Sequence, residues 1–122
     1  MFTFTRLYSD SSGESHFDDV EVRFAPVDRV AGAPPLNLSD ITNCAHVRFM
    51  EAPAAWSSDW HTSSARTLFI VLSGQWEITV SDGESRHFAI GSVLLLESTS
   101  GIGHASRITS VDGSLAAMIE LS

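Results

Sequence analysis

The stretch Trp60–Gly74, WHTSSARTLFIVLSG, decides the fold of this chain. Its later part, Thr67–Leu72, has the β-branched and aromatic content of a buried strand, and Ser73-Gly74 is a turn signal. The run is too short and too closely bounded to favour a helix. Alternate side chains of an extended strand share one face. On this stretch that face holds His61, Ser63, Thr67 and Phe69. The combination indicates the wall of a pocket with a polar mouth and an apolar floor.

The size and charge of the chain narrow the classes of function. Its 122 residues, 43% of them hydrophobic, predict a single globular domain with a substantial core. The formal net charge of −8 repels phosphate backbones and anionic membrane surfaces, so we expect neither nucleic acid nor a membrane as a partner. No apolar run approaches the ~20 residues that a membrane-spanning helix needs.

The N-terminus and the cysteine content predict a cytoplasmic protein. The opening segment MFTFTRLYSD has neither a basic region nor a continuous apolar core, so it predicts a strand and not a signal peptide. The lone Cys44 excludes an internal disulfide, which suits a reducing compartment, and we expect its thiol to be buried and inert.

Short strands with glycine-bearing turns between them account for most of the chain. No stretch predicts an amphipathic helix of more than two turns, and the pattern indicates an all-β barrel or jelly roll. The continuous apolar run at 93–96 suits a strand that is covered on both faces. The expected strands lie at residues 2–7, 16–24, 45–51, 67–72, 75–81, 93–96, 104–109 and 115–121.

Two connections carry their own predictions. Asp82-Gly83 favours a two-residue hairpin turn, which would pair Val80 with Ser85. The connector Ala25–Asp40 holds three of the four prolines, so we expect it to strap the outside of the domain without forming an element of its own.

The two histidine-bearing segments resemble the motifs of a small bacterial cupin. In the first cupin motif, G-x5-H-x-H-x3,4-E-x6-G, His61 matches the first His and Gly74 the closing Gly, whereas Ser63 and Thr67 replace the second His and the Glu. In the second motif, G-x5-P-x-G-x2-H-x3-N, Gly91 matches the first Gly, Glu97 replaces the Pro, and His104 matches the His if the turn holds two extra residues. The resemblance covers about residues 56–109.

This resemblance implies a double-stranded β-helix, the jelly-roll barrel of the cupins. Residues 1–122 would form a single cupin domain with its core at about 45–121. The strands within 1–24 would lie at an open edge and could add to the sheet of a second copy. A homodimer would bury that edge in both subunits.

The departures from the motif bear on metal binding. Cupin metal sites use three imidazoles and one carboxylate, and only His61 and His104 remain at those positions. Neutral hydroxyls are poor ligands for a divalent transition metal, so we predict no cofactor. If a metal were bound, His61 and His104 would be its ligands, with Glu97, Glu51 or His46 as a possible third.

The sequence therefore predicts a cupin that binds a small organic molecule in a His-lined pocket. His61 and His104 are the candidate catalytic residues, because an imidazole can act as acid or base near neutral pH without a metal. Two alternatives stay open: a metal-dependent cupin enzyme, either a dioxygenase or an isomerase, and a non-catalytic structural or regulatory cupin. The candidate ligand-binding residues are Ser63, Thr67, Phe69, Trp60 and Glu97.

Overall fold

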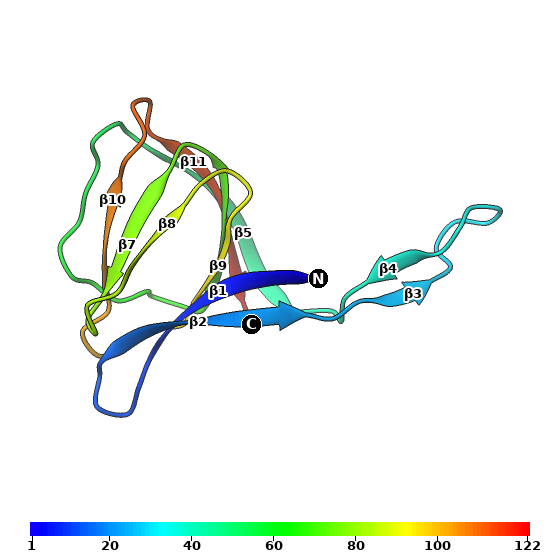
Figure 1. Ribbon diagram of the computed structural model, residues 1–122, viewed down its shortest axis with the longest axis horizontal. Helices are drawn as coiled ribbons and strands as arrows, with labels where there is room; N and C mark the ends of the chain where they lie inside the picture. Colours follow the sequence, from blue (N-terminus) through cyan, green and yellow to red (C-terminus); the bar gives the residue numbers. More distant parts are fainter.

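All regular structure in the protein is β-strand. The computed structural model describes residues 1–122 and contains eleven strands (Figure 1). It has no helix long and apolar enough to cross a membrane. The strands are β1 Phe2–Ser9, β2 Ser15–Val22, β3 Ala25–Val27, β4 Leu36–Leu38, β5 Cys44–Ala52, β6 Thr67–Ser73, β7 Trp76–Val80, β8 Ser85–Phe88, β9 Val93–Leu96, β10 His104–Ile108 and β11 Ser114–Leu121.

Two sheets enclose the core of the body. The larger sheet has six strands in the order β2-β1-β9-β6-β11-β5, and the smaller has three in the order β10-β7-β8. Their strands run as in a jelly roll, but the two sheets are not hydrogen-bonded into one closed barrel. The predicted all-β class is confirmed.

The core follows the period-two pattern of the strands. On β6 the side chains of Thr67, Phe69 and Val71 are buried, while those between them are not. On β7 the buried residues are Trp76 and Ile78, together with Val80. These inward side chains pack against one another between the two sheets, where they form the hydrophobic core of the body.

The hairpin between β7 and β8 differs from its predicted form. Val80 N donates to Glu84 O at 3.0 Å, so the loop has three residues, and Gly83 takes a positive φ of 101°. Thr79, not Val80, is therefore opposite Ser85. The turn is held in this form because Ser81 N donates to Ser15 Oγ of β2 at 2.8 Å and Glu84 N donates to Asp82 Oδ1 at 2.9 Å.

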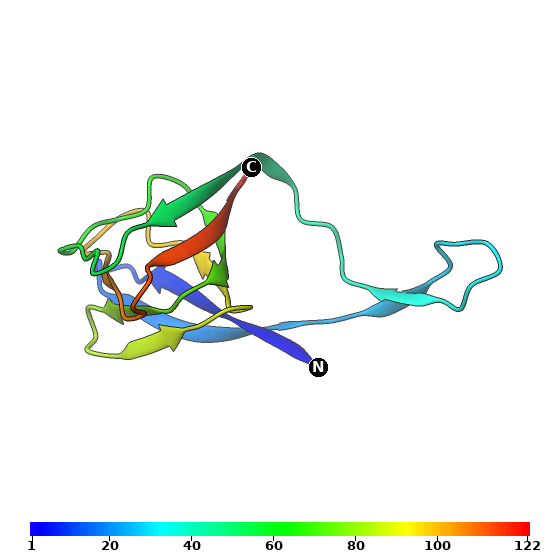
Figure 2. The ribbon, with the colours of Figure 1, turned by 90° about the horizontal axis from the view of Figure 1, so that it is seen from above.

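The proline-bearing connector is also different from its prediction. Its strands β3 and β4 pair with each other and project away from the body, as both views show (Figures 1 and 2). We call residues 23–43 the arm. Pro26 is compatible with this short ladder because a two-stranded hairpin needs no donor on its outer edge. Cys44, where the arm rejoins the body, is exposed, which corrects the expected burial of its thiol.

Candidate functional site

His61 and His104 meet although they are far apart in the sequence. Their backbones form an isolated antiparallel bridge, in which His61 N donates to His104 O and His104 N donates to His61 O, both at 2.9 Å. The centroids of the two rings are 4.5 Å apart, with the ring planes inclined at 56°. The segment that carries His61 thus lies beside β10 like an additional short strand, and it brings both imidazoles to the same place.

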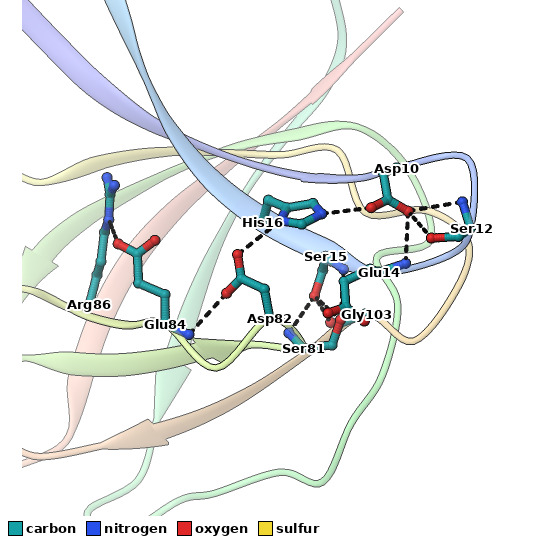
Figure 3. Close-up of polar contacts among 10 residues, drawn as sticks. All are labelled: Asp10, Ser12, Glu14, Ser15, His16, Ser81, Asp82, Glu84, Arg86 and Gly103. Carbon is teal, nitrogen blue, oxygen red and sulfur yellow. Dashed lines mark hydrogen bonds and ion pairs between the residues drawn. The ribbon is translucent and has the colours of Figure 1, made fainter.

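Gly103 makes this approach possible. A Cβ atom at this residue would lie 1.9 Å from His61 O, and the backbone has a φ of +79° that favours glycine. The Gly103 carbonyl is held in turn by the buried hydroxyl of Ser15, whose Oγ donates to it at 2.6 Å (Figure 3). The bridge between the two histidines therefore depends on the glycine at position 103 and on the hydrogen bond that Ser15 of β2 donates to it.

The His61 ring is oriented by its own loop. Its Nδ1 lies 2.9 Å from the carbonyl oxygen of Asp59, which can only accept, so Nδ1 carries the proton. Ser58 Oγ lies 3.2 Å from the same nitrogen. The Nε2 atom makes no hydrogen bond with the protein and keeps its lone pair. His61 is exposed and so presents an available base.

His104 has the opposite environment. Only 3% of it is exposed, and its Nδ1 lies 3.2 Å from Oγ of the fully buried Ser98. Burial, and secondarily the neighbouring imidazole of His61, lower the pKa of His104 to about 4. His104 is therefore neutral near pH 7, and its Nε2, which has no protein partner, can exchange a hydrogen bond with a bound molecule.

Both imidazoles line a cavity of about 230 Å³ between the sheets. No Asp, Glu, Lys or Arg side chain lines it. Its apolar members are Met50, Trp56, Phe69, Trp76, Ile78, Leu96 and Met118. Its polar members are His61, Thr62, Ser63, Ser64, Thr67, His104 and Ser106. The cavity is smaller than the 300–1,000 Å³ common for ligand sites, so it suits a small molecule.

Trp76 organises the aromatic side of the cavity. Its ring lies 5.5 Å from that of Phe69 at 89° and 5.7 Å from that of Trp56 at 66°, both edge-on arrangements that aromatic pairs favour. The indole Nε1 donates to Ser114 Oγ at 2.8 Å, so its polar atom is satisfied within the core. These rings form a rigid wall that matches flat apolar groups.

The structure places the predicted ligand-binding residues in two groups. Ser63, Thr67 and Phe69 line the cavity, whereas Trp60 and Glu97 lie outside it, which corrects their expected placement. Trp60 is 48% exposed. Glu97 follows Leu96, whose side chain points inward, and so turns to the other face, where Arg66 Nε donates to it at 2.7 Å.

Several lining residues were not predicted from the sequence. Met50 and Met118 lie on strands whose alternation is visible in the sequence, but nothing there says which face of β5 or β11 meets the cavity. Trp76 and Ser106 share the inward face of β7 and β10 with buried apolar residues, and that shared face was a usable signal.

The donor set does not fit the metal site typical of cupins. Ser63 and Thr67 occupy two of the four ligand positions, and no group of three or more His, Cys, Asp or Glu side chains is placed to hold an ion. None of the three proposed substitutes joins the histidines at the cavity: Glu51 and His46 line a separate hollow, and Glu97 is paired with arginines. Two imidazoles without an anionic ligand are a weak site for a divalent metal.

A second hollow of about 560 Å³ adjoins the cavity and shares four residues with it, Met50, Ser64, Thr67 and Met118. It lies along the edge strand β5 and carries Arg48, His46, Glu51 and Glu120. Charged groups thus lie where the cavity opens toward this edge.

Comparisons with known proteins bear on the fold. No protein-family model matches the sequence, and no curated protein is significantly similar to it. Protein NMB1881 from Neisseria meningitidis is 18% identical over 82% of this chain and 84% of that chain, with a TM-score of 0.45. The cupin domain of Cnp3 from Schizosaccharomyces pombe is 14% identical over 88% of this chain and 73% of that chain, with a TM-score of 0.50. At 14% identity the likeness to the Cnp3 domain shows the fold alone: this chain has a cupin-like fold, which is the fold that the resemblance of its two histidine segments implied.

Proposed function

We propose that the protein binds a small, uncharged organic molecule in the cavity and transfers a proton on it without a metal. The observation that carries the proposal is the convergence of His61 and His104 on a cavity that no charged side chain lines. A buried charge without a partner is strongly unfavourable, so a neutral ligand is the better match for these walls.

The two histidines take different roles in this proposal. His61 is the general base, because its Nε2 has a free lone pair and its ring is exposed. His104 is the hydrogen-bond partner that stays neutral, because its pKa is lowered to about 4. His61 would remove a proton from a C–H or O–H group of the ligand and return it to another atom of the same molecule. Such a step is an isomerisation with no net change in protons.

Binding is tested with neutral probes matched to the aromatic wall. Phenol and benzamide should shift the NMR signals of the His61 and His104 rings, and benzoate, which carries a charge, should not. A Ser106→Phe substitution, which fills the cavity, should abolish the shifts, while His87→Ala on the outer surface should leave them unchanged. Absence of any shift with both neutral probes would overturn the binding proposal.

Proton transfer is tested separately. In D2O, neutral ketones such as acetophenone and cyclohexanone should lose the NMR signal of the protons next to the carbonyl faster with wild-type protein than in buffer. The His61→Ala variant should lose this acceleration while still binding phenol. Equal exchange by wild type and variant would leave a binding protein with no base catalysis, the non-catalytic alternative.

The location of the protein stays a prediction. Cys44 is exposed and unpaired, and a reducing compartment such as the cytoplasm would keep this thiol free.

A further inference from the structure

The outward faces of the two sheets differ in their apolar content. The three-stranded sheet presents Glu77, Thr79 and Arg107, and Arg107 Nε donates to Glu77 Oε1 at 2.6 Å. These side chains make the outward face of the three-stranded sheet polar, as is usual for a face in contact with water. The six-stranded sheet presents apolar side chains from four strands, and the ion-paired residues Arg6, Asp18, Arg66 and Glu97 lie at one end of the same face. We call these residues the outer face: Phe4, Val20, Leu68, Ile70, Val93 and Leu95, which line a shallow hollow of about 670 Å³.

In a sheet with one face exposed to solvent, each strand alternates between apolar and polar residues. Strands that are covered on both faces are apolar throughout. Strands β6 and β9 belong to the second kind, because Phe69 and Leu94 are buried inward while Ile70 and Val93 point outward. Two adjacent central strands with apolar residues on both faces are typical of a sheet that a further layer covers on its outward side.

The arm continues the same apolar surface. It leaves from β2 and returns to β5, which are the two edge strands of the six-stranded sheet. Phe24 is 50% exposed and Leu36 is 54% exposed, and both lie on a segment that projects away from its own body (Figure 2). Phe24 at the base of the arm borders the hollow of the outer face, so arm and face form one continuous surface.

The chain exposes more surface than a compact monomer of its mass. The chain exposes 7520 Å², whereas a compact monomer of 13.2 kDa exposes about 6,400 Å². The excess of about 1,100 Å² exceeds the ~800 Å² that each partner contributes to a standard interface.

We propose that two copies of this chain pack outer face against outer face about a two-fold axis, with each arm lying along the other copy. The centre of the face carries no charge, so two acidic chains can meet there without opposed like charges. Its rim carries both signs, with Arg23 and Arg66 beside Asp40 and Glu21. A two-fold axis brings the same surface of both copies into contact. A rim that carries positive and negative side chains can therefore form ion pairs with the identical rim of the second copy.

The proposal is tested by the mass of the protein in solution. Light scattering after gel filtration at ~20 µM should give about 26 kDa for wild type, twice the 13.2 kDa of one chain. Ile70→Glu should give about 13 kDa, because it puts a carboxylate in the centre of the face. Val111→Glu, at a residue that is 89% exposed in the β10–β11 turn, is the matched control and should leave the mass at about 26 kDa.

A second variant decides the outcome if Ile70→Glu does not fold, as judged by circular dichroism and cooperative melting. The double substitution Phe24→Ser and Leu36→Ser changes only the arm and should raise the dimer dissociation constant at least ~10-fold. A wild-type mass of about 13 kDa, a mass well above 26 kDa, or a folded Ile70→Glu variant that stays dimeric would overturn the proposal. A dimer that the arm variant leaves unchanged would overturn the role of the arm.

Discussion

At the level of single residues, His104 shows how position changes the chemistry of a common side chain. The same imidazole that titrates near neutral pH in water is held neutral here by burial, while His61, 4.5 Å away, stays exposed and available as a base. A buried, neutral imidazole beside an exposed one can hold a polar group of a ligand and move a proton on it, without a metal.

The lowered pKa of His104 predicts a pH dependence of stability. Because the folded state resists protonation of this ring more than the unfolded state does, the stability present above pH 6.5 is lost as the pH falls toward about 4. The loss from this group should reach about 3 kcal/mol, following ~1.4 kcal/mol per pKa unit. Urea melts across this range should show the decline in wild type and a flatter profile in His104→Gln. Equal slopes in the two proteins would contradict the lowered pKa.

Gly103 gives a second prediction at this scale. Its replacement by Ala places a Cβ 1.9 Å from His61 O and also demands a positive φ, so we expect a loss of ~2–4 kcal/mol in unfolding free energy. Gly91→Ala is the matched control, since its φ is +86° but no atom lies within 4 Å of the added Cβ, and it should cost only ~1 kcal/mol. Chemical denaturation measures both. NMR contacts between the two imidazoles should vanish only in Gly103→Ala, and their survival would show that the bridge tolerates a side chain.

At the level of elements, one histidine clamps two turns together. His16 at the start of β2 lies 2.7 Å through Nε2 from Asp10 in the β1–β2 turn, and 2.8 Å through Nδ1 from Asp82 in the β7–β8 turn (Figure 3). The hydrogen bonds to the two carboxylates raise the pKa of His16, and the pairing lowers the pKa values of Asp10 and Asp82. The clamp joins the large sheet to the small one at the end of the body where Ser15 anchors Gly103.

The clamp predicts a loss of stability at alkaline pH. A raised pKa in the folded state means that the contribution of His16 is complete below pH 6.5 and is lost as the pH rises through the folded value. The lowered pKa values of the two aspartates mean that their contribution is complete above their ordinary value of 3.8 and is lost as the pH falls below it, so the clamp stabilises the fold most between pH 3.8 and pH 6.5. Thermal melts from pH 6 to pH 9 should show a decline in wild type that His16→Gln abolishes. His46→Gln, at a histidine without an ion pair, should keep the decline, and a decline unchanged in His16→Gln would contradict the clamp.

The elements also show what the sequence could predict. Alternation correctly placed Ser63, Thr67 and Phe69 on the face of His61, because side-chain direction along a strand is a local property. The same alternation, counted from Leu96, would have sent Glu97 outward. The meeting of His61 with His104 and the three-residue β7–β8 loop depend on contacts with β10 and with Ser15. The resemblance to cupins implied the meeting of the two histidines, whereas the three-residue loop was not predicted.

At the level of the whole molecule, charge and apolar surface act against each other. Each chain carries a formal charge of −8, which repels a second copy at long range. The uncharged centre of the outer face attracts it at short range through the burial of apolar surface, at ~25 cal/mol per Å². The proposed dimer therefore depends on burial, with ion pairs confined to the rim.

This balance predicts how salt acts on the dimer. Raising NaCl from ~10 mM to ~150 mM shortens the screening length from about 30 Å to about 8 Å and so weakens the repulsion between the two acidic chains. The dimer dissociation constant, measured by sedimentation equilibrium, should therefore fall, by ~3-fold or more. Val111→Glu adds one negative charge per chain away from the face, so its dissociation constant should fall by at least as large a factor. An interface held by ion pairs would respond in the opposite direction, because salt screens attraction as well as repulsion. A dimer dissociation constant that rises with salt would therefore assign the contact to the charged rim instead of the apolar centre.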